Sequence, residues 1–186
     1  KMIKFVYQNK PKGTGDAVLK TKNIIKDNYF LMLLPDDLII KKNCSKDMIS
    51  IHNKKKCGVM ASMRVNKKTV NRWGIYSKKN QINKNNFYIN DVIEKPDIKS
   101  APSNNAVIGR YILPKKIFSK IKSLKKGRGG EIHITDAIRK LIMEKQKFIG
   151  HIFKGKYLDC GTMHGYIKSS LEASKIWKYA WLAQVM

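Results

Sequence analysis

The chain has 186 residues, of which 42% are hydrophobic and 9% aromatic, a composition that fits one folded domain and excludes a wholly disordered segment. No stretch approaches the roughly 18 to 20 uncharged apolar residues that a membrane span requires, so we expect no membrane partner. Its formal charge of +26 at pH 7 at first suggests a nucleic-acid binder. The cations are 34 Lys and only 5 Arg, however, and phosphate and base recognition favour arginine, so we expect a solvated basic surface without a specific nucleic-acid partner.

In the first third of the chain, the sequence predicts a strand, a glycine-rich turn, a helix and a second strand. Ile3–Tyr7 is typical of a short strand, and it is followed by the turn residues Pro11–Gly15 and a helical pattern from residue 16 to about 27. The next strand, Tyr29–Leu34, is almost continuously apolar and ends in the sequence Pro35-Asp36-Asp37. Continuous apolarity indicates burial on both faces, as in a parallel sheet.

Strands and helices continue to alternate through the rest of the chain. We expect strands at 58–65, in short pieces between 73 and 93, at 105–113, at 148–153 and at 156–158, and helices at 45–53, 114–124, 135–145 and 163–181. Pro114 is expected as a first helical residue and Thr135 as a helix cap. This order predicts a single α/β domain over residues 1–186, with a central mixed, mostly parallel sheet flanked by helices.

Two segments at strand ends could bind a ligand. The turn with Gly13, following Gln8, lets backbone amides approach an anion at the start of a helix, although a tight turn alone also explains the glycine. The carboxylates of Asp36 and Asp37 suit a hard cation such as Mg²⁺ at the end of a buried strand, with a turn or capping role as the alternative. Asp159 follows another strand and could provide a second carboxylate for the same ion.

The sequence Glu94-Lys95-Pro96 places an acid and a base at the end of an apolar run. Adjacent strand residues point to opposite faces, so these two side chains are expected to have different roles. The proline is expected to keep Lys95 extended. Lys95 is a candidate phosphate ligand, with an ordinary exposed cation as the alternative.

Cysteine and histidine usage argues against two other kinds of site. The three cysteines lie at wide spacing, and neither a disulfide framework nor a zinc motif is expected from them. The four histidines show no ligand spacing either. Reduced thiols of this kind are typical of the cytoplasm.

Taken together, the motifs occur in a known order. They are Gln8 with Pro11–Val18, Leu33–Asp37, Trp73–Ile75, Val92–Pro96, Ala101–Asn104, Ile108–Tyr111, Gly130–Ile138 and Tyr157–Gly161. This set resembles the uridylyltransferase branch of the sugar nucleotidyltransferase family over about residues 3–172. Each motif alone is modest, but eight in register make the resemblance specific.

The resemblance implies a Rossmann-like nucleotidyltransferase fold and an Mg²⁺-dependent enzyme that transfers a uridylyl group from UTP to glucose 1-phosphate, giving UDP-glucose and pyrophosphate. Such enzymes are usually cytoplasmic homo-oligomers. The roles it implies are uracil contacts for Gln8 and Gly13, Mg²⁺ ligation for Asp36 and Asp159, glucose contacts for Gly74, Glu94 and Gly109, and a phosphate contact for Lys95. Lys95 and Asp36 would then be the catalytic residues.

Two alternatives to this interpretation stay open. The family's opening glycine-rich nucleotide loop has no counterpart here, and we expect it to lie before Lys1 in a longer gene product. A non-catalytic fragment that binds a sugar nucleotide or a polyanion is therefore one alternative. The other is a thymidylyltransferase of the same family, which the sequences at 94–96 and 101–111 disfavour.

Overall fold

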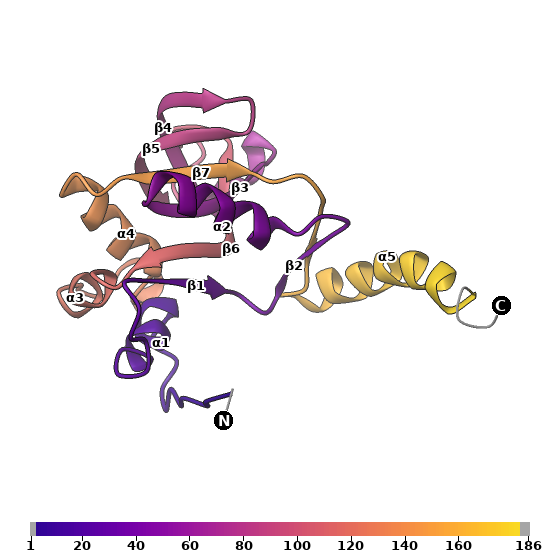
Figure 1. The fold of residues 1–186 in the computed structure, drawn as a ribbon, viewed down its shortest axis with the longest axis horizontal. Coiled ribbons are helices and arrows are strands. Elements are labelled where there is room, and N and C mark those ends of the chain that lie inside the picture. The colour runs from indigo at the N-terminus through magenta and orange to yellow at the C-terminus, as the bar shows by residue number, and fades with distance from the viewer. Residues whose placement is uncertain (1–2, 183–186) are drawn as a thin grey trace.

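The computed structural model describes residues 3–182, apart from the side chains of residues 128 and 177–182. Its helices are α1 (Thr14–Lys20), α2 (Cys44–Lys55), α3 (Ile117–Lys122), α4 (Ile134–Met143) and α5 (Met163–Leu182), with short 3-10 helices at Lys67–Arg72 and Arg128–Gly130. Its strands are β1 (Tyr29–Leu33), β2 (Asp37–Ile40), β3 (Gly58–Arg64), β4 (Gly74–Asn83), β5 (Asn86–Glu94), β6 (Asn105–Pro114), β7 (Phe148–Ile152) and β8 (Lys156–Asp159). The predicted alternation of strands and helices is confirmed over most of the described chain (Figure 1).

Six of the described strands form one sheet in the order β1-β6-β3-β7-β5-β4, and β2 pairs with β8 in a separate two-stranded sheet. A mixed sheet flanked by helices confirms the predicted α/β fold. The expectation of mostly parallel pairing is wrong, because β3 and β7 run parallel whereas the other described pairs run antiparallel. Apolar runs indicate burial, and burial does not depend on strand direction. The strand β1 itself lies at the sheet edge and is mostly half-buried.

Helices cover both faces of the large sheet. On one face, Val59 of β3 and Ile108 of β6 pack with Met48 of α2. On the other face, the neighbouring residues Met60 and Val107 belong to a larger cluster that includes side chains of α1, α3 and α4. The two-residue repeat of a strand produces this division. Because both faces are covered, the strand ends are where a site is expected.

Several local predictions differ from the structure. Ile3–Tyr7 forms no strand, although four of its five residues are apolar or aromatic. Pro114 does not start a helix but ends β6, where it lies opposite Tyr29 of β1. Proline is tolerated at such a strand end because no further ladder bond needs its missing N–H. The segment expected to form short strands is instead a hairpin of two long strands, β4 and β5.

The start of α4 depends on a distant residue. Thr135 is not the cap predicted from the sequence, because the helix begins one residue earlier, after His133. The backbone N–H of Ile134 donates to the hydroxyl oxygen of Thr14 at 3.2 Å. A side chain 120 positions away thus satisfies an amide at the helix start, and Thr135 is available for another contact.

The small sheet packs against the core cluster formed by β3, β6 and α2, and α5 follows it. Antiparallel pairing of β2 and β8 places Asp37 opposite Asp159. Helix α5 follows β8 and extends away from both sheets (Figure 1), with Tyr166, Ile167 and Leu171 more than half exposed. Within residues 3–182, no helix combines the length and the apolar character that crossing a membrane requires.

Gly150 of β7 provides a steric test of this fold. A Cβ at this position would lie 2.3 Å from Cζ of Phe87, which is fully buried and is its partner on β5. We expect Gly150→Ala to lower the free energy of unfolding by about 1–3 kcal/mol, because a rigid buried ring has little room to move. Chemical denaturation followed by circular dichroism measures this loss. In a Phe87→Leu background the same change should cost less, and an unaltered stability of Gly150→Ala would contradict the packing.

Candidate active site

One pocket collects the residues predicted to contact the sugar and its phosphate. It has a volume of about 210 Å³ and lies where β4, β5 and β6 meet the start of α4. Gly74, Glu94, Lys95 and Gly109 all line it, although they come from three separate sequence motifs. Asp37 lines it as well and was not assigned to the sugar from the sequence. The folded sheet therefore brings four predicted site residues to one place.

The carboxylate of Glu94 is fixed on the pocket wall. The hydroxyl of Thr135 donates a hydrogen bond to Glu94 Oε2 at 2.7 Å. Gly74 lies opposite Glu94 in the register of β4 and β5, and a Cβ on Gly74 would lie 3.2 Å from the same Oε2. Because residue 74 has no side chain, the Glu94 carboxylate and Thr135 can both lie close to β4. A carboxylate held in this way is suited to accept hydrogen bonds from the hydroxyl groups of a ligand.

Gly109 contacts a different carboxylate, that of Asp37. The backbone N–H of Gly109 donates to Asp37 Oδ2 at 2.7 Å. A Cβ on Gly109 would lie only 2.3 Å from that oxygen. The other oxygen, Oδ1, accepts a hydrogen bond from the hydroxyl of Tyr157. Asp37 thus occupies the space that Gly109 leaves open and forms part of the pocket wall.

Burial changes the acidity of several groups around the pocket. It raises the pKa of Asp37 above the ordinary value, and the hydrogen bonds from Tyr157 and Gly109 oppose this effect. Burial, together with the hydrogen bond to Asp37, raises the pKa of Tyr157. Burial also raises the pKa of Tyr111, and the charge of Glu94 adds to this increase. Both tyrosine hydroxyls are therefore protonated at neutral pH, and that of Tyr157 donates its hydrogen bond to Asp37.

Two cationic residues, Lys95 and Arg72, also line the pocket. The backbone N–H of Lys95 donates to the carbonyl of Trp73 at 2.9 Å. Lys95 has a φ of 44°, so the expectation that Pro96 keeps it extended is wrong. A left-handed residue of this kind costs of order 1–3 kcal/mol, which the contact to Trp73 helps to offset. The two cations provide charge that suits a phosphate group.

Gln8 and Gly13 lie together at the start of α1. The amide Nε2 of Gln8 donates to the carbonyl oxygen of Gly13 at 3.2 Å and to Asp16 Oδ2 at 2.7 Å. Gly13 has a φ of 101°, and a Cβ there would lie 2.6 Å from the carbonyl oxygen of Ile132, so this turn requires glycine. The next residue, Thr14, lines the pocket. The turn therefore borders the candidate active site.

The carboxylates of Asp36 and Asp159 approach one point beside the pocket. A Cβ on Gly161 would lie 2.9 Å from Asp36 Oδ2 and 3.3 Å from Asp159 Oδ1. The backbone N–H of Cys160 donates to the carbonyl oxygen of Asp36 at 2.8 Å and ties the two segments together. The structure thus brings together two carboxylates that are far apart in the sequence.

The carboxylate oxygens of Asp36 and Asp159 fit a Mg²⁺ ion as ligands. Carboxylate oxygens are hard ligands, and Mg²⁺ is usually held by one or two of them while water and substrate phosphates complete its shell. Asp36 is exposed and Asp159 half-buried, so an ion can reach both. The guanidinium of Arg72 lies 3.8 Å from Asp159 Oδ2. Among the residues that the structure describes, no group of three or more His, Cys, Asp or Glu side chains is arranged to hold a metal ion, so an ion would need further oxygen ligands from water or substrate.

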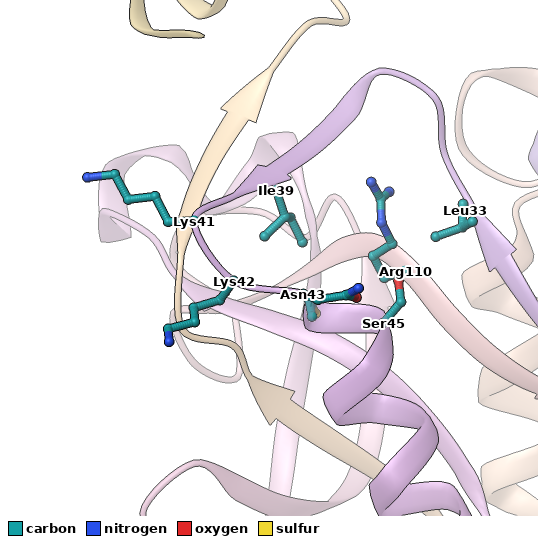
Figure 2. Close-up of a pocket in the computed structure, with 8 residues that line it drawn as sticks. Leu33, Ile39, Lys41, Lys42, Asn43, Ser45 and Arg110 are labelled. Atoms are coloured by element: carbon teal, nitrogen blue, oxygen red, sulfur yellow. The ribbon is translucent and has the colours of Figure 1, made fainter. Parts of the chain in front are cut away.

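A second pocket, of about 420 Å³, lies on the other side of β6 (Figure 2). It is lined by Arg110, the residue after Gly109, because consecutive strand residues point to opposite faces. Arg110 Nη1 donates to the carbonyl oxygens of Leu34 and Gly109. The amino groups of Lys41 and Lys42 point away from the guanidinium of Arg110 (Figure 2). The charges do not converge and none of the predicted site residues lines this pocket, so the smaller pocket is the candidate active site.

Sequence reasoning does not place three residues at the pocket that contains Glu94. The sequence offers Asp37 only as part of a carboxylate pair for a cation or as a turn residue, and its contacts to β6 and β8 carry no local sequence signal. The sequence predicts Thr135 as a helix cap, whereas in the structure its hydroxyl donates to Glu94. Arg72 is one of five arginines in a very basic chain, so its position at the pocket could not be inferred from the pattern.

The fold and the site define a class of protein. Residues 2–175 match the nucleotidyl transferase family, and the chain belongs to that family. Curated relatives named UTP–glucose-1-phosphate uridylyltransferase are 36% identical in Pseudomonas aeruginosa and 34% identical in Streptococcus pyogenes, over 89% and 91% of this chain. A solved structure of UDP-glucose pyrophosphorylase complexed with UDP-glucose is 36% identical and covers 92% of this chain with a TM-score of 0.87.

The relatives are longer than this chain. It spans 60% of the length of the Pseudomonas aeruginosa protein and 58% of the Streptococcus pyogenes protein. It covers 66% of the solved pyrophosphorylase chain. The likeness therefore concerns the part that holds the pocket described above.

Cysteine reactivity tests the exposure of the loop between β8 and α5. Cys44 and Cys57 are buried, and burial raises the pKa of the Cys44 thiol to about 11, whereas Cys160 is half-buried beside Asp159. We expect iodoacetamide at pH 8 to modify Cys160 first in the folded chain, because a buried thiol is neither accessible nor ionised. Peptide mass spectrometry after timed labelling measures this order. All three thiols should react in denaturant, and equal rates in the folded chain would contradict the described burial.

Proposed function

We propose that the protein containing this chain transfers the uridylyl group of UTP to glucose 1-phosphate, with Mg²⁺, giving UDP-glucose and pyrophosphate. The observation that carries the proposal is the gathering of Gly74, Glu94, Lys95 and Gly109 in one pocket beside two converging carboxylates. The names of the curated relatives and the UDP-glucose complex of the solved neighbour support the same substrates.

The pocket is suited to the glucose ring. In this proposal Glu94 accepts hydrogen bonds from sugar hydroxyls, while Gly74 and Gly109 let the ring approach the strands closely. Thr135 keeps the Glu94 carboxylate in place through its 2.7 Å hydrogen bond. A pocket of about 210 Å³ has room for one small polar ligand.

The phosphate of the substrate lies beside Lys95 in this proposal, and Arg72 adds a second cation at the same pocket. Glucose 1-phosphate is already an anionic nucleophile, so its attack on the α-phosphorus of UTP needs no general base. This fits the fact that none of the sequence motifs is assigned the role of a general base. The task of the protein is to orient the two phosphates and to neutralise their charge.

Asp36 and Asp159 would hold the Mg²⁺ ion. When bound, Mg²⁺ neutralises charge on the phosphate oxygens of the nucleotide. The exposure of Asp36 and the half-burial of Asp159 leave room for substrate oxygens to complete the ligand shell. In the absence of an ion, the nearby guanidinium of Arg72 offsets the charge of Asp159.

Gln8 and Gly13 would contact the uracil. The hydrogen bond between them fixes the glutamine side chain against the glycine turn, and the turn leads directly to Thr14 at the pocket. An amide side chain and a backbone amide can each pair with the edge of a base. A cytoplasmic location and a homo-oligomeric state belong to the same proposal, on the grounds of the reduced thiols and the family resemblance.

Removal of either metal carboxylate tests the proposal. We expect Asp36→Asn and Asp159→Asn to lower Mg²⁺-dependent UDP-glucose formation by about 10²–10⁴-fold, because each removes a charge that holds the ion. The same variants should lose the increase in UDP-glucose affinity that Mg²⁺ produces. Turnover is measured by chromatography of nucleotide sugars, and affinity by isothermal titration calorimetry.

Asp27→Asn is the matched control, because it removes an equal charge at an exposed position between α1 and β1. Its turnover and affinity should stay close to those of the wild type. Replacing UTP by dTTP separates the uridylyl from the thymidylyl reaction. Full Mg²⁺ dependence in Asp36→Asn, or a preference for dTTP, would count against the function proposed here.

A further inference from the structure

Asp37 lies where the sugar pocket and the metal carboxylates meet. It is the second residue of the aspartate pair, and the proposed function assigns a role only to the first, Asp36. Asp37 opens β2, is half-buried and lines the pocket that contains Gly109 and Glu94. Its place in the fold therefore gives it access to both halves of the site.

The two oxygens of the Asp37 carboxylate have partners in different sheets. Oδ2 accepts the backbone N–H of Gly109, in β6 of the large sheet, at 2.7 Å. Oδ1 accepts the hydroxyl of Tyr157, in β8 of the small sheet. Both partners are donors in this arrangement, and a carboxylate is the short side chain that offers an acceptor to each. One side chain thus joins the two sheets.

On the sugar side, the fit between Asp37 and β6 is close. The missing side chain of Gly109 is what admits the carboxylate, because a Cβ would lie 2.3 Å from Oδ2. Leu34, on the loop before Asp37, is tied to the same strand, since its N–H donates to the carbonyl of Gly109 at 2.8 Å. The position of the β6 backbone at the pocket is therefore coupled to the start of β2.

On the metal side, the contact reaches Asp159 through its own strand. Tyr157 and Asp159 are two residues apart on β8, so their side chains share one face of the small sheet. Asp37 is also the register partner of Asp159. Fixing the hydroxyl of Tyr157 against Asp37 therefore limits the rotation and sliding of the strand that carries Asp159.

We propose that Asp37 is a positioning residue that sets the distance between the sugar pocket and the pair Asp36–Asp159. This inference rests on the proposed function, because it concerns where the sugar and the Mg²⁺ ion lie relative to each other. Asp37 acts through two partners: through Gly109 it shapes the sugar pocket, and through Tyr157 it orients the metal-side strand. Removing one partner should therefore impair one half of the site more than the other.

The experiment compares Asp37→Ala with Tyr157→Phe. Isothermal titration calorimetry gives the affinity for UDP-glucose and for UDP, which lacks the sugar, at saturating Mg²⁺. It also gives the Mg²⁺ concentration that half-saturates the gain in UDP-glucose affinity. Asp37→Ala loses both contacts, so we expect about a tenfold loss of UDP-glucose affinity, a smaller loss for UDP, and a higher Mg²⁺ requirement.

Tyr157→Phe keeps the contact between Asp37 and Gly109. We expect its affinity for UDP-glucose at saturating Mg²⁺ to stay within about threefold of the wild type, while its Mg²⁺ requirement rises by about three- to tenfold. A general loss of stability would lower the UDP-glucose affinity and raise the Mg²⁺ requirement together. A raised Mg²⁺ requirement with a nearly unchanged affinity is therefore specific to positioning. Tyr88→Phe, which removes a hydroxyl at another pocket, is the matched control.

Asp37→Asn keeps the test valid if Asp37→Ala does not fold. An amide can accept from Gly109 through its oxygen and donate to the Tyr157 oxygen through its nitrogen, so it preserves both hydrogen bonds. We expect this variant to retain UDP-glucose affinity within about threefold of the wild type. Thermal unfolding of each variant verifies that the folded protein is measured.

Three outcomes would overturn the inference. Equal losses for UDP and UDP-glucose in Asp37→Ala would show that the residue does not act on the sugar pocket. An unchanged Mg²⁺ requirement in Tyr157→Phe would show that the carboxylate acts by touching the ligand itself. If the whole wild-type protein that contains this chain binds neither UDP-glucose nor UDP, the proposed function and this inference are refuted together, whereas the first two outcomes leave the proposed function intact.

Discussion

The arrangement of the site depends on a carboxylate that joins the two sheets. The large sheet carries the pocket with Gly109, and the small sheet carries Asp159 on β8. Asp37 bonds to the backbone of one and to Tyr157 of the other. Transfer between phosphate groups requires reacting atoms in a near-attack geometry, in which a displacement of about 1 Å can cost a large part of the rate. A fixed separation of the sheets is therefore a condition for the proposed chemistry.

The charge distribution at the pocket differs from that of the whole chain. The chain has 39 basic and 13 acidic residues, yet four of its carboxylates, on Asp36, Asp37, Glu94 and Asp159, lie at or beside one pocket. A divalent cation would be stabilised there, and carboxylates can accept hydrogen bonds from the hydroxyl groups of a ligand. The basic remainder of the chain attracts anions at long range.

Most of the secondary structure could be predicted because it depends on local patterns. Apolar runs gave β3 and β6, and helical periodicity gave α2 and α5, with ends within a few residues. The pairing direction could not be obtained in the same way, because a strand buried under helices on both faces has the same composition in either direction. Pro114 was misassigned because its fixed φ suits both a helix start and a strand end.

The sequence by itself determined the chemical groups available: glycines where backbone must approach closely, carboxylates after strand ends, and the order of strands and helices. Only the tertiary structure decided which of these groups meet. Asp37 accepts hydrogen bonds from Gly109, 72 positions away in the sequence, and from Tyr157, 120 positions away. The hydroxyl of Thr14 accepts the first N–H of α4, which is also 120 positions away in the sequence. Such contacts depend on how whole sheets and helices pack, whereas periodicity and capping rules describe only interactions within a few residues.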